Sequence, residues 1–425
     1  MHQREAHARR LAISHTRRNA VEASRLRDRS GEEAGLRLIL SAAACVMLFT
    51  TIAAAATSAD CSAPAVMSDR WAVSSPAEQR LDPQLVCSIG SGLAMLRDAD
   101  PHGVVVIRHR VLVYEQYFTG EDLRGWTPVG TVPHDANTLH NTESITKGVV
   151  ALLVGVAFDR GWLHDLDAPI YSFLPEYADL RSPDQDRITL RHLLSMTSGL
   201  DWPERALAVD NPANIVRRGR IAPDPYRFVL ERSVVAMPGL VWNYNGGGVW
   251  LLGLLLSKVS GRPLDDLARV TLFEPLGIND WEWEHFPNGG PDTAGGLRLR
   301  PRDLAKLGQL VLDGGAWRGQ QIVPAHWVQQ MTARQSPRGS WFGFADAYGY
   351  LWWQGRSSIG GRDIDWIAAF GRGGQRLYVV PSLDLVVVVT AGLYESSHGG
   401  PPSPQESLAA DTVLNSYVLP AALRP

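Results

Sequence analysis

The stretch that decides the fold of this chain reads Asn141-Thr142-Glu143-Ser144-Ile145-Thr146-Lys147-Gly148-Val149-Val150, and it runs directly into a long apolar segment. A serine followed three residues later by a lysine places both side chains on one face of a helical turn. In that arrangement the lysine can lower the proton affinity of the serine hydroxyl or, once deprotonated, accept its proton. The spacing therefore suggests Ser144 as a nucleophile, with Lys147 as its partner.

The spacing alone is weak support for this chemistry. The chain contains three lysines, Lys147, Lys258 and Lys306. With serine at average usage, the chance that one of three lysines falls at this offset is roughly one in five. The apolar residues that follow, up to about Arg160, form a nearly continuous hydrophobic surface, which predicts a buried helix. The assignment of a catalytic serine therefore depends on the neighbouring motifs.

The composition is that of an ordinary globular protein. The chain has 425 residues, of which 45% are hydrophobic and 20% are charged. This length exceeds the usual size of one domain, so we expect either one large catalytic unit with a helical insert or two lobes. A formal charge of −3 provides no general attraction to nucleic acid. The sequence motifs of zinc, nucleotide and dinucleotide sites do not occur, and no cofactor is expected.

The first 60 residues have the features of an export segment. Residues 1–37 are polar and rich in arginine, and they precede an apolar core and an alanine-rich run that ends near Ala59. This order of charge, apolar core and small residues is that of a secretory signal. The apolar run is close to the roughly 20 residues that span a bilayer, so a signal-anchor with a transmembrane helix is the alternative to a cleaved signal peptide. We expect an exported protein, periplasmic or extracellular, or anchored in the inner membrane.

The cysteine content agrees with export. Cys45 lies in the apolar core of the leader, which leaves Cys61 and Cys87 in a mature chain. In an oxidising compartment these two residues could form a disulfide, and two unpaired thiols are the equally weighted alternative. Neither cysteine has a histidine nearby in the sequence, so a thiol nucleophile is not expected.

Strand patterns lie near both ends of the chain that follows the leader. Residues 103–108 and 111–118 are rich in β-branched and aromatic residues and predict a β-hairpin. Residues 376–381 and 383–393 predict two further strands, with Asp384 at the turn. Between these regions the sequence is helical and rich in loops, and prolines interrupt it repeatedly.

Strands at both ends with helices between them predict an α+β fold. We expect a mostly antiparallel sheet built from both ends of the domain and flanked by helices, with an inserted helical lobe over roughly residues 160–330. The expected organisation is a basic leader over residues 1–60, a linker over residues 61–84, and one domain over residues 85–420.

Several collinear motifs together resemble the serine β-lactamase-related superfamily. The motifs are Thr142–Lys147, Asp159–Gly161, Leu166–Pro169, Ile188–Leu200, Ala294–Leu299, Arg302–Ala305 and Tyr348–Trp353. This superfamily includes class C β-lactamases, D-Ala-D-Ala carboxypeptidases, carboxylesterases and 6-aminohexanoate-dimer hydrolases. The resemblance runs from about Gly103 to Leu419. It implies a β-lactamase/transpeptidase-like fold and a serine hydrolase that works without a metal or cofactor.

The resemblance also implies a role for each residue of the site. Ser144 would attack a carbonyl group and become acylated, and Lys147 would lower or shuttle its proton. Tyr244 stands where the family has a Tyr-x-Asn motif and would act as the general base and later as the acid; alone, it would be read as a core aromatic residue ahead of a glycine turn. The backbone N–H groups of Ser144 and of Arg372 would form the oxyanion hole.

Two motifs depart from the family pattern. Gly246 replaces the asparagine of Tyr-x-Asn, so Asn245 is expected to bind the substrate in its place. The third motif is Lys-Thr-Gly in β-lactamases and penicillin-binding enzymes, where its lysine holds a substrate carboxylate. Here the segment reads Ala369-Phe370-Gly371-Arg372-Gly373-Gly374-Gln375, from which Gly371 and Gly373 are expected to contact the substrate. Both departures favour the esterase and 6-aminohexanoate-dimer-hydrolase branch, with a small-molecule ester or amide as substrate.

Two alternatives stay open at this point. A β-lactamase or D-Ala-D-Ala peptidase is disfavoured by the lost lysine. A non-catalytic envelope binding protein of the same fold would not need Ser144, Lys147 and Tyr244 together. A Ser-His-Asp hydrolase would require Gly-x-Ser-x-Gly after a strand, and this pentapeptide does not occur.

Other side chains receive weaker assignments. Trp202, Trp352 and Trp353 fit an aromatic wall of an acyl pocket, although packing in the core is the commoner role of buried indoles. Asp201 and Glu204 are given no role, because a solvated loop is expected around both.

The histidines are also given no role in the chemistry. His102, His134 and His140, like the other histidines beyond the leader, lack the sequence spacing of metal ligands. No metal site is therefore expected.

Overall fold

The structure, a computed structural model, describes residues 61–287, 289–337, 345–394 and 403–424. The predicted leader over residues 1–60, with its signal peptide or transmembrane helix, lies outside the described residues. Among the residues that are described, no helix is both long enough and apolar enough to cross a membrane.

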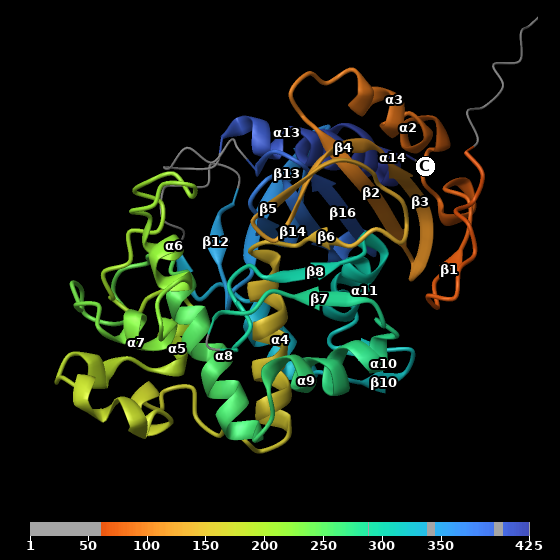
Figure 1. Cartoon of the computed structure of the whole chain (residues 1–425). Helices are drawn as coiled ribbons and strands as arrows, with labels where there is room; N and C mark the ends of the chain where they lie inside the picture. The colour runs from red at the N-terminus through yellow and green to blue at the C-terminus, as the bar shows by residue number, and fades with distance from the viewer. Residues whose placement is uncertain (1–60, 288, 338–344, 395–402, 425) are drawn as a thin grey trace, which may run out of the picture. The chain divides into compact units, whose positions relative to one another are not determined.

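A nine-stranded sheet forms the centre of the domain (Figure 1). Its strand order is β1-β3-β2-β16-β15-β14-β13-β12-β11, and every neighbouring pair except the parallel pair β1–β3 is antiparallel. The strands, in this spatial order, are β1 (Ala72–Val73), β3 (Val111–Tyr117), β2 (Pro101–Arg108), β16 (Leu385–Ala391), β15 (Gln375–Val380), β14 (Arg362–Gly371), β13 (Trp353–Ile359), β12 (Ala347–Tyr348) and β11 (Ser336–Pro337).

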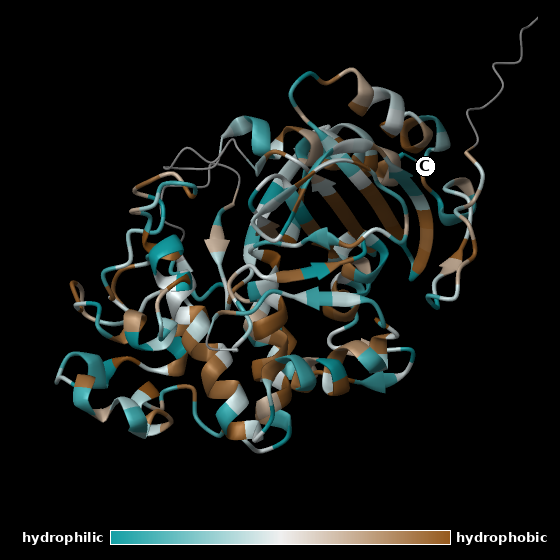
Figure 2. Cartoon of the chain, viewed as in Figure 1, coloured by the Kyte–Doolittle hydropathy of each residue, from teal (hydrophilic) through white to brown (hydrophobic). Residues whose placement is uncertain are grey.

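The two ends of the domain meet in the middle of this sheet. Strand β2 pairs with β3 as the predicted hairpin, and on its other side it pairs with β16, with Val106 opposite Val387. Strands β2 and β16 are rich in valine and buried nearly throughout, and Figure 2 shows them in the hydrophobic colour. The expectation of one mostly antiparallel sheet built from both ends is confirmed.

The helices cover the sheet and form the lobe that the sequence inserts between the N-terminal and the C-terminal strands. They are α2 (Pro83–Cys87), α3 (Ile89–Ala94), α4 (Ile145–Asp159), α5 (Leu190–Leu194), α6 (Ile215–Arg220), α7 (Pro225–Leu230), α8 (Gly246–Ser260), α9 (Leu264–Ala268), α10 (Glu274–Leu276), α11 (Pro301–Leu312), α12 (Ala325–Thr332), α13 (Pro404–Thr412) and α14 (Leu419–Leu423). Helix α11 packs against β2, β15 and β16. The α+β fold with an inserted helical lobe is therefore as expected.

Helices α4 and α8 pack against each other and are buried on almost every side. A helix that is apolar all round belongs in a core, and both helices are largely hydrophobic in Figure 2. The side chain of Asn245 caps α8 by accepting a hydrogen bond from the N–H of Gly248 at 2.9 Å. Gly261 ends the helix with a φ of 66°, a left-handed conformation that glycine adopts without a steric penalty.

Three small sheets lie outside the main one. Strands β4 (Thr119–Arg124) and β5 (Thr127–Pro133) form a hairpin, and β9 (Ala316–Trp317) and β10 (Gln320–Gln321) form a second. A three-stranded sheet has the order β6-β8-β7, with bounds His140–Asn141 for β6, Leu297–Leu299 for β8 and Trp281–Trp283 for β7. Because β6 leads directly into α4, this small sheet positions the start of that helix.

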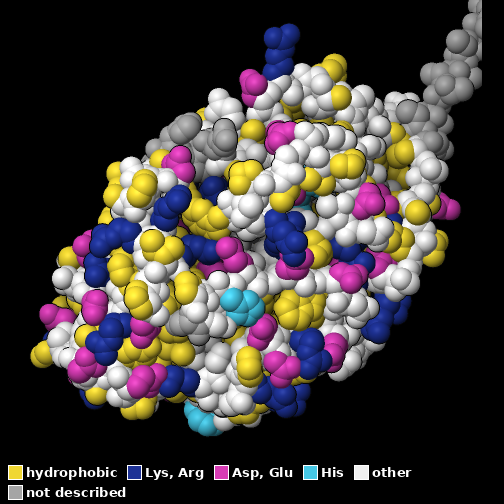
Figure 3. Space-filling model, in the orientation of Figure 1, with side chains coloured by type: hydrophobic (Ala, Val, Ile, Leu, Met, Phe, Trp, Pro, Cys, Tyr) yellow, Lys and Arg dark blue, Asp and Glu magenta, His cyan; other side chains and the backbone are white. Residues whose placement is uncertain are grey.

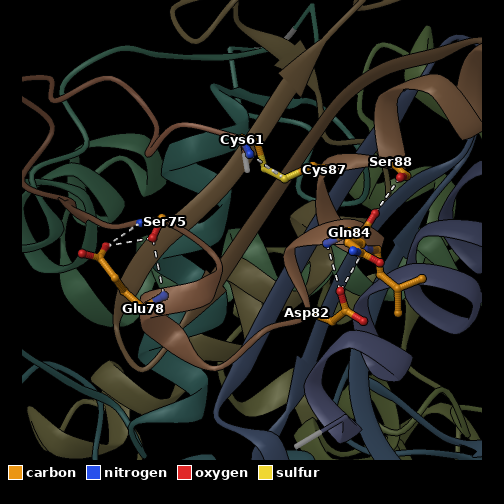
Figure 4. Close-up of a disulfide and its surroundings, with 8 residues drawn as sticks. Cys61, Ser75, Glu78, Asp82, Gln84, Cys87 and Ser88 are labelled. Carbon is orange, nitrogen blue, oxygen red and sulfur yellow. Dashed lines mark hydrogen bonds between the residues drawn. A yellow bond between two sulfur atoms is a disulfide. The ribbon is translucent and has the colours of Figure 1, made fainter. Parts of the chain in front are cut away.

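The segment 61–84 belongs to the packed domain, so its expected role as a linker was wrong. Its strand β1 extends the main sheet, and the indole N–H of the buried Trp71 donates to the carbonyl of Arg302 at 3.0 Å. Cys61 and Cys87 form a disulfide, with Cα atoms 5.4 Å apart (Figure 4). The choice that the sequence left open between a disulfide and two free thiols is thereby decided.

Charged side chains of both signs are interspersed over the face seen in Figure 3. Most of the ion pairs at the surface join an arginine to a carboxylate, as between Arg110 and Asp313 at 2.7 Å. Such a mixed surface agrees with the small formal charge of −3.

Candidate active site

Ser144 and Lys147 meet at the N-terminus of α4, where Ser144 is the residue that precedes the first helical turn. The Lys147 ammonium donates to the Ser144 hydroxyl, with Nζ 2.8 Å from Oγ, and also to the carbonyl oxygen of Ala294 at 2.6 Å. Lys147 is 2% exposed, so the helix core encloses its stem and holds the amine against the serine. The chain enters this turn through Glu143, whose φ of 51° lies in the left-handed region.

Tyr244 lies near the lysine, two residues before α8 begins at Gly246. The Nζ atom of Lys147 lies 4.9 Å from the centroid of the Tyr244 ring. The phenol ring stacks on the indole of Trp353 with centroids 6.1 Å apart. The structure therefore brings together Ser144, Lys147 and Tyr244, which come from two helix starts separated by 97 residues of sequence (Tyr244 minus Lys147).

The end of strand β14 approaches the same serine. A Cβ atom built on Gly371 would lie 2.4 Å from the carbonyl oxygen of Thr142, so only glycine fits at this point. Arg372 follows and forms an ion pair with Glu143 at 3.2 Å. The buried Gln375 donates to the carbonyls of Arg372 at 3.2 Å and Ala391 at 2.7 Å, which ties the loop to β16.

A cavity opens over these groups. The residues that line it are Trp126, Glu143, Ser144, Lys147, Glu204, Arg205, Leu207, Val209, Val216, Arg220, Tyr244, Asp292, Ala294, Gly295, Trp353, Phe370, Gly371, Arg372, Arg376 and Glu406. The structure thus brings five of the predicted site residues to one cavity: Ser144, Lys147, Tyr244, Gly371 and Arg372.

Asn245 and Gly373 are not among the lining residues of this cavity. Asn245 is 2% exposed, and its amide is used to cap α8, so the expectation that it replaces the missing asparagine was wrong. Gly373 has a φ of 80° in the turn between β14 and β15, and a Cβ there would lie 2.7 Å from the Tyr394 ring. Its role is to let this turn pack closely, and the direct substrate contact expected for it does not follow from the geometry.

The space of the missing asparagine is taken by Glu204, which the sequence analysis left without a role. A Cβ built on Gly246 would lie 3.0 Å from Oε2 of Glu204, and the N–H of Gly246 donates to that oxygen at 2.6 Å. The indole N–H of Trp202 donates to the same oxygen at 2.9 Å. A carboxylate that accepts both donors lies fixed in the cavity wall. The sequence signal for this role was the position of Glu204 two residues after Trp202.

The three candidate tryptophans divide between wall and core. Trp353 lines the cavity and stacks on Tyr244, as an aromatic wall requires. Trp202 and Trp352 are 1% exposed and pack in the core, where Trp352 contacts the backbone of Gly148 in α4. The commoner role of buried indoles therefore holds for two of the three.

Three of the histidines that were given no role lie close together in the structure, although they lack the spacing of metal ligands along the sequence. His102, His134 and His140 come together with Asp122, and one ligand atom from each of the four lies within 4.8 Å of the others. They come from β2, β4, β6 and the residue after β5, so their separation along the sequence carries no information about their distance in space.

The fold and the arrangement of the cavity define a protein of the β-lactamase and penicillin-binding-protein class. A family model described as Beta-lactamase matches residues 97–404, which is more than half of the chain. The chain belongs to the β-lactamase family.

Two curated relatives show where the chain stands among its neighbours. Esterase EstB of Burkholderia gladioli is 27% identical over 186 residues, which make up 41% of this chain and 45% of the esterase. The 6-aminohexanoate-dimer hydrolase of Paenarthrobacter ureafaciens is 25% identical over 286 residues, or 63% of this chain and 69% of that protein. The chain thus spans about half the length of the esterase.

Solved structures show the same fold. A putative 6-aminohexanoate-dimer hydrolase from Bacillus anthracis superposes with a TM-score of 0.59 at 19% identity, covering 75% of this chain and 78% of that one. A penicillin-binding protein homologue from Pyrococcus abyssi superposes with a TM-score of 0.58 at 22% identity, covering 77% of each chain. At this level of identity the likeness concerns the fold alone.

Proposed function

We propose that this protein is a serine hydrolase that cleaves an ester or amide bond of a small molecule through an acyl-enzyme intermediate on Ser144. The observation that carries the proposal is the 2.8 Å contact between Ser144 Oγ and Lys147 Nζ in a cavity also lined by Tyr244. The relatives named as an esterase and as a 6-aminohexanoate-dimer hydrolase support this class of bond.

In the proposed reaction, Ser144 Oγ attacks the carbonyl carbon of the substrate and forms a new C–O bond. The hydroxyl proton passes to Lys147 as Lys147 passes one of its own protons to the phenolate of Tyr244, and Tyr244 then protonates the leaving alcohol or amine as the scissile bond breaks. The backbone N–H groups of Ser144 and Arg372 stabilise the negative charge on the carbonyl oxygen. Water then attacks the acyl group by the reverse proton path and restores the serine.

The missing lysine of the third motif supports a substrate without a free carboxylate. Of the cations that line the cavity, Arg220 forms ion pairs with Glu284 and Asp292, and Arg372 pairs with Glu143. Glu204 adds a carboxylate to the wall at the position next to Gly246. An anionic substrate would have to approach Glu204 without the lysine that β-lactamases and peptidases use.

The decisive experiment is the intact mass of the protein after reaction with a fluorophosphonate probe. We expect a single adduct on the parent protein and none on Ser144→Ala, because only an activated serine reacts with this probe. Ser91→Ala is the matched control: Ser91 is an exposed serine on α3, and this variant should label like the parent. Folded parent protein that forms no adduct would refute the proposal and leave a binding role for the cavity.

A substrate panel separates the hydrolase branches. Short-chain p-nitrophenyl esters and amides should be turned over far faster than a penicillin, a cephalosporin or a D-Ala-D-Ala peptide. Comparable rates on a cephalosporin would instead favour the β-lactamase alternative.

We also propose that the protein acts outside the cytoplasm. The Cys61–Cys87 disulfide supports this, because such bonds persist mainly in oxidising compartments. A fusion of residues 1–100 to alkaline phosphatase, which is active only after export, tests the proposal. An inactive fusion that is stably produced would refute it.

A further inference from the structure

Three histidines and one aspartate form a closed cluster beside the catalytic cavity. His102, His140 and Asp122 are 1%, 2% and 3% exposed, and His134 is half-buried. One ligand atom from each residue lies within 4.8 Å of the other three. Nothing in the proposed hydrolysis uses these groups.

Four backbone segments hold the cluster together. His102 is on β2, Asp122 on β4 and His140 on β6, and His134 directly follows β5. The N–H of Phe118 donates to the carbonyl of His102 at 3.0 Å, and the N–H of His134 donates to that of Phe118 at 3.3 Å. Strand β4 also packs against β2 and β6, and Figure 1 shows β4, β5 and β6 together in front of the main sheet. The four side chains are therefore placed by backbone hydrogen bonds and strand packing.

The outer nitrogens of two rings face acceptors. Nδ1 of His140 lies 3.0 Å from the carbonyl oxygen of Asn141, so this nitrogen must carry a proton and donate. Nε2 of His102 lies 3.5 Å from Oδ2 of Asp100 and, among the described residues, has no hydrogen-bond partner. The carbonyl behind His140 is a partner that metal-binding histidines typically have.

The inner nitrogens of these two rings face each other. Nδ1 of His102 and Nε2 of His140 are 2.8 Å apart. Because the proton of His140 is on its outer nitrogen, Nε2 is an acceptor, and either Nδ1 of His102 donates to it or a cation lies between the two nitrogens. Within the described part of the chain, Nε2 of His134 is also buried without a hydrogen-bond partner. Oδ1 of Asp122 lies 3.7 Å from Nε2 of His140 and is the fourth potential ligand atom of the cluster.

We propose that His102, His134, His140 and Asp122 bind one Zn²⁺ ion. Three imidazoles and one carboxylate are ligands that suit zinc, and four protein ligands in a closed site are typical of structural zinc. Zinc bonds of about 2.0–2.1 Å in a tetrahedron place the ligand atoms roughly 3.4 Å apart. To reach this geometry, the His102–His140 pair at 2.8 Å would widen by about 0.6 Å, and the other separations, which are at most 4.8 Å, would contract by up to about 1.4 Å.

The position of the site gives the ion a structural role. It would join the β4–β5 hairpin to β6, which leads directly into Ser144. The turn of that hairpin carries Trp126, which lines the cavity and lies under the guanidinium groups of Arg220 and Arg372 at 5.0 and 5.2 Å from its ring centroid. The bound ion would therefore hold both the cavity wall and the start of α4.

Binding of Zn²⁺ to the full chain, purified without a histidine tag and treated with EDTA, tests the proposal. Isothermal titration should give one Zn²⁺ per chain, and the melting temperature should rise when zinc is added. His134→Gln removes one ligand at the half-buried edge of the cluster and should raise the dissociation constant for Zn²⁺ at least about 10-fold. His164→Gln changes an exposed histidine outside the cluster and should bind zinc like the parent.

Two results would overturn the proposal. One is EDTA-treated parent protein that takes up no zinc, which would leave a shared proton between His102 and His140. The other is equal binding by the parent and by His134→Gln, which would mean adventitious zinc only. If His134→Gln fails to fold, the visible spectrum of the parent with Co²⁺ decides. Intense bands of a tetrahedral site support the proposal, and the weak bands of an octahedral, hydrated ion refute it.

Discussion

Replacing Gly371 by alanine should remove most of the activity while leaving the protein folded. The new Cβ would lie 2.4 Å from the carbonyl oxygen of Thr142 and 3.0 Å from Cβ of Glu143. Ordinary contacts begin at 3.4 Å, so the end of β14 and the segment before Ser144 must separate by about 1 Å (3.4 minus 2.4). The three nearest atoms are this backbone oxygen and the Cβ atoms of Gln375 and Glu143, so no flexible side-chain end can absorb the shift.

The expected magnitude follows from what the strand end carries. Arg372 follows Gly371 directly, and its N–H is one of the two proposed oxyanion donors. Loss of one such donor costs roughly 10²–10³-fold in turnover, and a misplacement of about 1 Å costs a similar factor. We therefore expect kcat/KM for a short-chain p-nitrophenyl ester to fall by about 10²–10³-fold. The overpacking should cost about 1–3 kcal/mol of stability, measured by urea unfolding.

The matched control is Gly295→Ala, which alters the same cavity without a clash. A Cβ there would lie 3.8 Å from the carbonyl carbon of Glu143, an ordinary contact. Its activity should stay within about threefold of the parent, equivalent to roughly 0.6 kcal/mol of barrier. A folded Gly371→Ala variant with activity as high as that of Gly295→Ala would refute the assignment of the oxyanion hole.

Three further changes test other contacts. Lys147→Met should slow both ester hydrolysis and fluorophosphonate labelling of Ser144 by about 10²–10⁴-fold, and unchanged labelling would argue against proton transfer through the amine. Asp303→Asn removes the charge that pairs with the fully buried Lys306 at 2.7 Å, and urea unfolding should show a loss of about 3–5 kcal/mol; a loss below about 1 kcal/mol would mean that the lysine is neutral or rehydrated. Cys61→Ser opens a disulfide whose cysteines are 26 residues apart. From the entropy of the closed loop, the free energy of unfolding should fall by about 3.5 kcal/mol. Equal unfolding midpoints for this variant and the oxidised parent would contradict that figure.

Local patterns in the sequence were sufficient for the main elements. The β-branched runs around Val106 and Val387 predicted strands, and the apolar residues after Ser144 predicted a buried helix, because each pattern reflects the periodicity of one element. The sequence did not reveal the packing of residues 61–84. That segment is held by the Trp71 indole and by pairing with β3, contacts that join positions far apart in the chain.

Prediction of the site followed the same division. Asn245 could be a substrate ligand or a helix cap, and only its 2.9 Å bond to Gly248 decided for the cap. Glu204 was predicted to be a loop residue, because the Gly246 N–H from which it accepts a hydrogen bond lies 42 positions away in the sequence. Residues with several possible roles cannot be assigned without the distances to their partners.

The sequence by itself determined the pairing of Ser144 with Lys147, because an offset of three residues at a helix start brings two side chains together whatever surrounds the helix. The tertiary structure decided the rest. Tyr244 and Gly371 reach the cavity of the serine, and the histidines of β2, of β6 and of the residue after β5 reach Asp122, through strand and helix packing. These groups are brought together by the folding of distant segments, so their mutual distances are not encoded in any local pattern.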